Sequence, residues 1–180
     1  LADKGVFSHT ADGLSAEERV SLEGYRWCKL SENLSLRRQS QVFTATELAN
    51  EVIDGWMKSP QHRKNLTDPY VTETGIGVAA APETSQKYIS VQLFARPQTY
   101  QFQISIKNTT NTPISYTLGS KEKIASPRMT LRHSVCEPQM IIFNFENQKK
   151  ILARYEAKDN TIFTLSEDQD RNLNVDITHK

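Results

Sequence analysis

The clearest pattern in the chain lies at residues 44–57, TATELANEVIDGWM, where apolar residues recur at helical spacing. The positions that carry this stripe are Ala45, Leu48, Ala49, Val52, Ile53, Trp56 and Met57. Thr44 and Glu47 fit a capping box at the start of the segment. Ser59–Pro60 ends it, because the residue before a proline is disfavoured in helical geometry. The pattern predicts a helix over 44–57 with one buried face.

Other parts of the first half predict a mixture of helix and strand. Residues 14–27, LSAEERVSLEGYRW, intersperse charged residues with a few apolar ones, which favours an exposed helix closed by Gly24. Residues 75–81, GIGVAAA, and 87–95, KYISVQLFA, are short and apolar, and the turn-like residues 82–86 separate them. The last two segments predict a β-hairpin.

After Pro97 the pattern changes to the period-two alternation of strands, with no further helical period. Turn clusters at 108–113 and 156–160 interrupt it. The strand-like runs are YQFQISIKN, ISYTL, RMTLRH, MIIFNF, ILARYEA, TIFTL and LNVDI. The sequence therefore predicts two different domains, a mixed one at 1–97 and an all-β sandwich or barrel at 98–180.

Charge and hydropathy exclude two classes of protein, those that bind nucleic acid through a basic surface and those that span a membrane with a helix. The 180 residues carry 22 Lys and Arg against 21 Asp and Glu, so the formal charge is +1 and no basic surface for nucleic acid is indicated. No apolar run reaches the ~20 residues of a membrane span. The chain opens on Leu1, neither a start methionine nor a signal peptide, so it has the look of a processed or trimmed chain.

Four motifs now line up in the first half: FSHTADG at 7–13, GYRWCKLSENLS at 24–35, VIDGWMKSPQHRKNL at 52–66, and TGIGVA followed by YISVQLFA. In this order and spacing they resemble the bacterial branch of the CAP superfamily over residues 1–96. That superfamily also contains cysteine-rich secretory proteins, venom antigens and plant pathogenesis-related proteins. The long W-M-x-S-P-x-H-R-x-N-L match is more specific than any single short motif.

The resemblance implies an α+β fold: an α-β-α sandwich, here without the family's first helix, followed by the all-β domain. It also implies a cleft in which His9, Glu32 and His62 hold a divalent metal. Zinc is the expected ion, because imidazole nitrogens and one carboxylate are suitable ligands for it. The family's second glutamate is replaced by Ser59, and the glycine before its Glu-Asn pair is Ser31.

Ser59, Arg63 and Asn33 are the further residues expected in that cleft. Each of these candidate site residues can also have a purely structural role. The two histidines can be structural, and Arg63 with Lys64 can be a solvated helix end. Trp56 belongs to the helix stripe and favours core packing, whereas Tyr25 is a candidate for an apolar groove.

The two cysteines, Cys28 and Cys136, are the candidates for one disulfide, since the resemblance gives Cys28 no family counterpart. Buried free thiols are the alternative. We expect a non-catalytic secreted, periplasmic or cell-surface protein that binds a lipid, wall polymer or protein, and not nucleic acid. One rival is a metal-dependent hydrolase of peptides or cell wall with Glu32 as general base; the other is a structural or adhesion protein with a vestigial cleft. No motif in 98–180 indicates a mechanism.

Overall fold

The structure is a computed structural model that describes residues 7–10, 13–80, 86–144 and 151–179. The chain divides into two compact units, Leu1–Thr99 and Tyr100–Lys180. The first contains helices and strands, and the second contains strands, in agreement with the predicted α+β class. Each unit has its own core.

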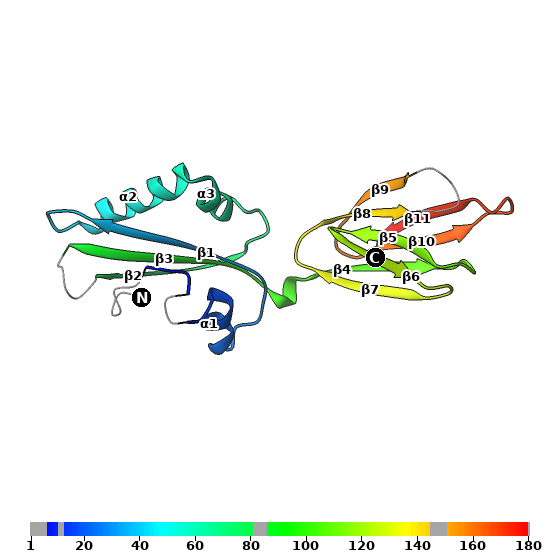
Figure 1. The fold of residues 1–180 in the computed structure, drawn as a ribbon, viewed down its shortest axis with the longest axis horizontal. Coiled ribbons are helices and arrows are strands. Elements are labelled where there is room, and N and C mark those ends of the chain that lie inside the picture. The colour runs from blue at the N-terminus through cyan, green and yellow to red at the C-terminus, as the bar shows by residue number, and fades with distance from the viewer. Residues whose placement is uncertain (1–6, 11–12, 81–85, 145–150, 180) are drawn as a thin grey trace. The chain divides into compact units, whose positions relative to one another are not determined.

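The first unit is built around one antiparallel sheet with helices on both faces (Figure 1). Its strands lie in the order β1-β3-β2. Helices α2 and α3 lie over one face, and α1 lies on the other (Figure 1). The elements are α1 (Ala16–Leu22), β1 (Trp27–Arg38), α2 (Ala45–Lys58), α3 (Pro60–Leu66), β2 (Glu73–Ala80) and β3 (Lys87–Pro97). This is the α-β-α arrangement that the family resemblance implies.

The local signals for the helices and the hairpin are confirmed. Helix α2 begins after Thr44, whose side chain and that of Glu47 form the complete capping box. Gly24, after α1, has a φ of +77°, a conformation that glycine adopts without strain. Strands β2 and β3 pair antiparallel as the predicted hairpin, and residues 82–85 of its turn lie outside the described residues.

Two features of this unit differ from the sequence reading. The segment after α2 is a helix in its own right, because Pro60 occupies the first turn, where its missing N–H costs nothing. Residues 27–38 form the long strand β1, for which no element was predicted. The period-two run of Leu30, Leu34 and Leu36 favours a strand, but the charged Glu32 interrupts it.

The core of the first unit lies between α2 and the sheet. Leu48, Val52 and Trp56 are buried there, against partly buried Phe43, Leu66 and Tyr88. The indole N–H of Trp56 donates to the backbone carbonyl of Leu34 at 3.0 Å, which fixes α2 over β1. Burying each of the three α2 side chains contributes roughly 1.5–3 kcal/mol.

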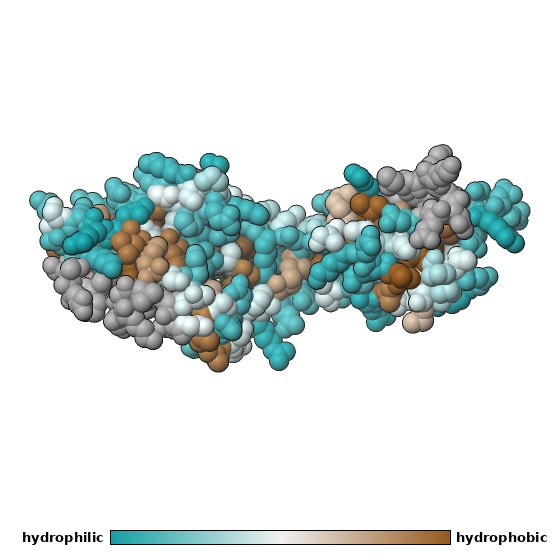
Figure 2. Space-filling model, viewed as in Figure 1, coloured by the Kyte–Doolittle hydropathy of each residue, from teal (hydrophilic) through white to brown (hydrophobic). Residues whose placement is uncertain are grey.

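Strand β2 is exposed along its whole length. Its largest apolar side chains, Ile76 and Val78, are 68% and 55% exposed. Helices α2 and α3 pack over β1, at the opposite edge of the sheet, and so leave β2 uncovered. Figure 2 shows hydrophobic side chains open to solvent on the first unit.

The second unit contains eight strands within the described residues, in two four-stranded sheets. One sheet has the order β11-β10-β4-β7 and the other β6-β5-β8-β9; all pairs are antiparallel except β4 with β10. The strands are β4 (Phe102–Asn108), β5 (Ile114–Leu118), β6 (Lys121–Ala125), β7 (Thr130–Val135), β8 (Gln139–Asn144), β9 (Ile151–Ala157), β10 (Thr161–Glu167) and β11 (Leu173–His179). The seven predicted strands all appear, and β6 is the one that the pattern missed.

Alternate residues of both sheets fill the core of the second unit. Ile104, Ile106, Tyr116, Phe143 and Phe163 are each fully buried, as the period-two pattern predicts. The rings of Phe143 and Phe163 lie 5.6 Å apart in a tilted arrangement. Among the described residues, no helix of either unit is long and apolar enough to cross a membrane.

Candidate functional site

Glu32 is a buried carboxylate on the face of the sheet that α1 covers. Its side chain is only 4% exposed. Oε1 accepts a hydrogen bond from Nδ1 of His9 at 2.7 Å, and Oε2 accepts one from the guanidinium of Arg19 at 2.6 Å. His9 and Glu32 therefore meet, as the family resemblance implies, but a third residue from α1 joins them.

Arg19 organises this cluster from its centre. One of its nitrogens, Nη1, donates to the backbone carbonyls of His9 and Leu14, at 2.9 and 2.8 Å. Its other terminal nitrogen pairs with the Glu32 carboxylate. The planar guanidinium thus connects the segment before α1 to strand β1, which the single point charge of a lysine would do less well.

The arrangement limits what Glu32 can do chemically. A general base must present a free oxygen to the proton that it removes. Both oxygens of Glu32 already accept charge-assisted or polar hydrogen bonds, and a fixed cation balances the carboxylate charge. Such an arrangement is typical of a side chain that organises a fold.

His62 contacts the sheet from its other face. Because successive strand residues point to opposite faces, Asn33 lies on the α2 and α3 side, whereas Glu32 lies on the α1 side. The Asn33 amide donates to the backbone carbonyl of His62 at 3.1 Å and accepts from Asn65 at 2.8 Å. Asn33 is fully buried, so in this arrangement it joins β1 to α3.

The other two residues expected in the cleft, Ser59 and Arg63, belong to the start of α3. Ser59 links α2 to α3, its backbone carbonyl accepts from the amide of Arg63 at 2.9 Å, and its hydroxyl makes no capping bond. Arg63 is exposed. Nearby on the sheet, Ser35 Oγ and Gln92 Oε1 are buried and have no hydrogen-bond partner among the described residues, which is typical of a site for ordered water.

Within the described part of the chain, His9, Glu32 and His62 do not converge on one point. No group of three or more His, Cys, Asp or Glu side chains within the described part of the chain is close enough to hold an ion. A divalent ion at Glu32 would also have to compete with the positive guanidinium of Arg19 for Oε2. The three-residue metal site stays a prediction.

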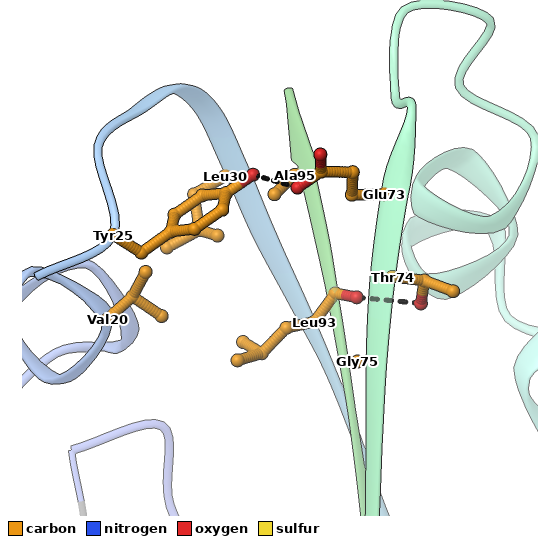
Figure 3. A pocket seen from close by; sticks show the side chains of 8 residues that line it. All are labelled: Val20, Tyr25, Leu30, Glu73, Thr74, Gly75, Leu93 and Ala95. Carbon is orange, nitrogen blue, oxygen red and sulfur yellow. Dashed lines mark hydrogen bonds between the residues drawn. The ribbon is translucent and has the colours of Figure 1, made fainter. Parts of the chain in front are cut away.

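A pocket of about 230 Å³ opens on the same face as Glu32. Strand pairing places Leu93 directly between Glu32 and Gly75, so the buried cluster lies beside the pocket wall. Figure 3 shows its side chains, which come from α1, the segment after it and all three strands. The lining residues are Val20, Tyr25, Leu30, Glu73, Thr74, Gly75, Leu93 and Ala95. Most of these surfaces are apolar.

A polar pair lies at one side of this pocket. The Tyr25 hydroxyl donates to the carboxylate of Glu73, and this contact reaches from the segment after α1 to β2 (Figure 3). Burial, followed by the hydrogen bond to Glu73, raises the pKa of Tyr25 to about 12. The phenol is therefore neutral at physiological pH and remains a hydrogen-bond donor.

Both cysteines of the chain are disulfide-bonded and neither is a free thiol. This excludes the reading of Cys28 and Cys136 as small buried hydrophobes. A disulfide fits an oxidising compartment outside the cytosol.

Sequence reasoning missed two of the residues that shape the site, Arg19 and Glu73. Arg19 lies in a helix whose alternating charges are typical of any solvent-exposed helix. Its pairing with Glu32 depends on tertiary structure and has no signal in the sequence. Glu73 precedes the predicted hairpin strand without a distinctive motif. Tyr25, a candidate for an apolar groove, does line the pocket, and Trp56 lies in the core.

Comparison with known proteins agrees with the geometry. No curated protein matches the chain. Residues 6–94 match the cysteine-rich secretory protein family, CAP, and this range covers the helices and strands of the first unit almost completely. The first unit of this chain belongs to the CAP family.

Proposed function

We propose that this chain is a non-catalytic, extracellular CAP-family protein that binds an apolar segment of its ligand in the pocket between α1 and the sheet. The observation that carries the proposal is the pocket itself, with its apolar floor of Leu30, Leu93 and Ala95. Ligand pockets typically combine such apolar walls with a few placed polar groups. Tyr25 and Glu73 supply those groups here.

A lipid acyl chain or a comparable hydrocarbon group suits this site best. The volume of about 230 Å³ is below the 300–1,000 Å³ of most small-molecule sites, so it accommodates one part of a ligand. The neutral phenol of Tyr25 and the carboxylate of Glu73 give it a polar end that favours an uncharged donor or acceptor over an anion.

The state of Glu32 supports binding over hydrolysis. The rival hydrolase needs Glu32 as a free base, and the hydrogen bonds from His9 and Arg19 occupy both of its oxygens. The disulfide-bonded cysteines and the family of the first unit support a place outside the cytosol.

Two glycines of β2 provide a matched test. Gly75 lines the pocket and Gly77 lies next on the same face; a β-carbon at either meets nothing within 4 Å. Gly75→Val should place its methyl groups in the pocket, whereas Gly77→Val should add them outside it. We would measure displacement of a fluorescent, uncharged lipid such as a labelled fatty alcohol from the full chain.

We expect saturable binding that Gly75→Val weakens at least about tenfold and Gly77→Val changes less than about twofold, since filling the site removes apolar contacts. Equal binding by the wild type and Gly75→Val would disprove the proposed site. Metal-dependent turnover of a peptide or wall substrate that disappears in Glu32→Gln would instead support the hydrolase.

A further inference from the structure

The second unit has a pocket whose charged lining residues are all basic. It measures about 360 Å³ and lies where β6 and β7, the edge strands of the two sheets, come together. Lys121 and Lys123 come from β6, and Arg132 and His133 come from β7. The complete lining is Leu118, Ser120, Lys121, Lys123, Arg132, His133, Ser134, Val135 and Gln139. Within the described part of the second unit, no carboxylate lines it.

The register of the sheet explains why cations gather here. Lys123 pairs with Tyr116 and Lys121 pairs with Leu118, so both lysines lie on the face of β6 that is turned toward the core. Lys123 is only partly exposed. Among the described residues, neither lysine nor Arg132 forms an ion pair. Partly buried charges are normally paired, because leaving water is costly for them.

His133 lines the pocket from the core-facing side of β7. Its Nε2 lies 2.7 Å from the hydroxyl of Tyr116, a residue of the opposite sheet. Burial raises the pKa of Tyr116 to about 12, so the phenol stays neutral and can either donate to Nε2 or accept from it. The contact joins β7 to β5 beside the two lysines.

From this arrangement we propose that the pocket binds a phosphate or sulfate group. Such an oxyanion has several acceptor oxygens and a charge that the two inward lysines match well. A single inward lysine on an edge strand is also a known protection against unwanted strand pairing. That role requires one cation, whereas two lysines and a histidine face this pocket from β6 and β7.

The proposal is independent of the lipid pocket, because it concerns the other unit. Its test is calorimetric titration of the full chain, at low salt, with inorganic phosphate, inorganic sulfate and dextran sulfate. Lys121→Gln and Lys123→Gln each remove one cation from the pocket. Lys107→Gln is the matched control, because Lys107 is an exposed lysine on the outer face of β4.

We expect saturable binding that each pocket variant weakens at least about tenfold, the usual effect of losing one charge-assisted hydrogen bond, while Lys107→Gln stays within about twofold. Tighter binding of dextran sulfate than of free sulfate, with the same mutant pattern, assigns the site to a polymer-borne group. Binding of the free ions alone assigns it to a small anion.

Two results would overturn the proposal. One is the absence of saturable binding of all three probes to the wild type. The other is an equal loss of affinity in Lys107→Gln and Lys123→Gln, which would mean that only net charge matters. Lys121 is exposed, so its replacement tests the site even if Lys123→Gln disturbs folding.

Discussion

Arg19 and Glu32, thirteen residues apart in sequence, form a charge pair in the first unit in which the guanidinium lies 2.6 Å from the carboxylate oxygen Oε2. The carboxylate is almost inaccessible to solvent, whereas the arginine is about one quarter exposed. The pair places α1 on the sheet, and it also removes a free oxygen from the residue that a hydrolase would use. The predictions for the first unit start from this pair.

Arg19→Gln should destabilise the first unit by about 2–4 kcal/mol, because it leaves the buried carboxylate of Glu32 without its cation. Both tryptophans, Trp27 and Trp56, belong to this unit, so their fluorescence during urea unfolding reports on it alone. Arg38→Gln is the control, since Arg38 is exposed. An equally small effect of both substitutions would mean that the pair contributes little.

Zinc titration tests the predicted metal site at His9, Glu32 and His62. We expect weak binding to the wild type and tighter binding to Arg19→Gln, which frees an oxygen of Glu32 beside the His9 ring. Adding His9→Ala should abolish the gain, and His62→Ala should leave it unchanged, because His62 joins the other face of the sheet. Tight wild-type binding that His62→Ala removes would restore the three-residue site.

The disulfide is expected to join Cys28 to Cys136 within one chain, since both residues are bonded and the chain has two cysteines. The intact mass of the unreduced protein should be lower than that of the reduced protein by two hydrogens. The double substitution Cys28→Ser, Cys136→Ser should lower the free energy of unfolding by about 2–4 kcal/mol, chiefly because the unfolded chain regains the conformational entropy that the crosslink removes. Two free thiols, or a covalent dimer in the unreduced sample, would contradict this pairing.

His133 should make the second unit less stable in mild acid. Burial, with a smaller contribution from Lys123, holds its pKa below the usual value of about 6.5. The unfolded chain therefore binds more protons below that pH, and the free energy of unfolding falls as pH decreases toward the folded-state pKa. The groups around the ring are Tyr116, Lys121 and Lys123, with apolar Ile104 on β4.

Hydrogen exchange of amides in β5 and β7 measures this effect in the second unit alone. The loss of protection between about pH 7 and pH 5 should be smaller in His133→Gln than in the wild type. His179→Gln removes another histidine of the same unit and should keep the wild-type dependence. An unchanged pH dependence in His133→Gln would contradict the assignment.

Much of the architecture was visible in the sequence because its causes are local. The capping box of Thr44 and Glu47, the apolar stripe through Trp56 and the period-two alternation after Pro97 all depend on neighbours along the chain. Strand β6 was not predicted, because lysines occupy its inward positions, where apolar residues are expected. Strand β1 was not predicted, because Glu32 interrupts the alternation of its apolar residues.

Local patterns in the sequence were enough to predict the secondary structure of most segments and the division into a mixed and an all-β part, and they carry the CAP-family motifs. The pairing of Arg19 with Glu32, and the position of Glu32 and Asn33 on opposite faces of one strand, became evident from the fold. The reason is physical: periodicity reports which face of an element is apolar, whereas the partner of a charged side chain depends on how distant elements pack.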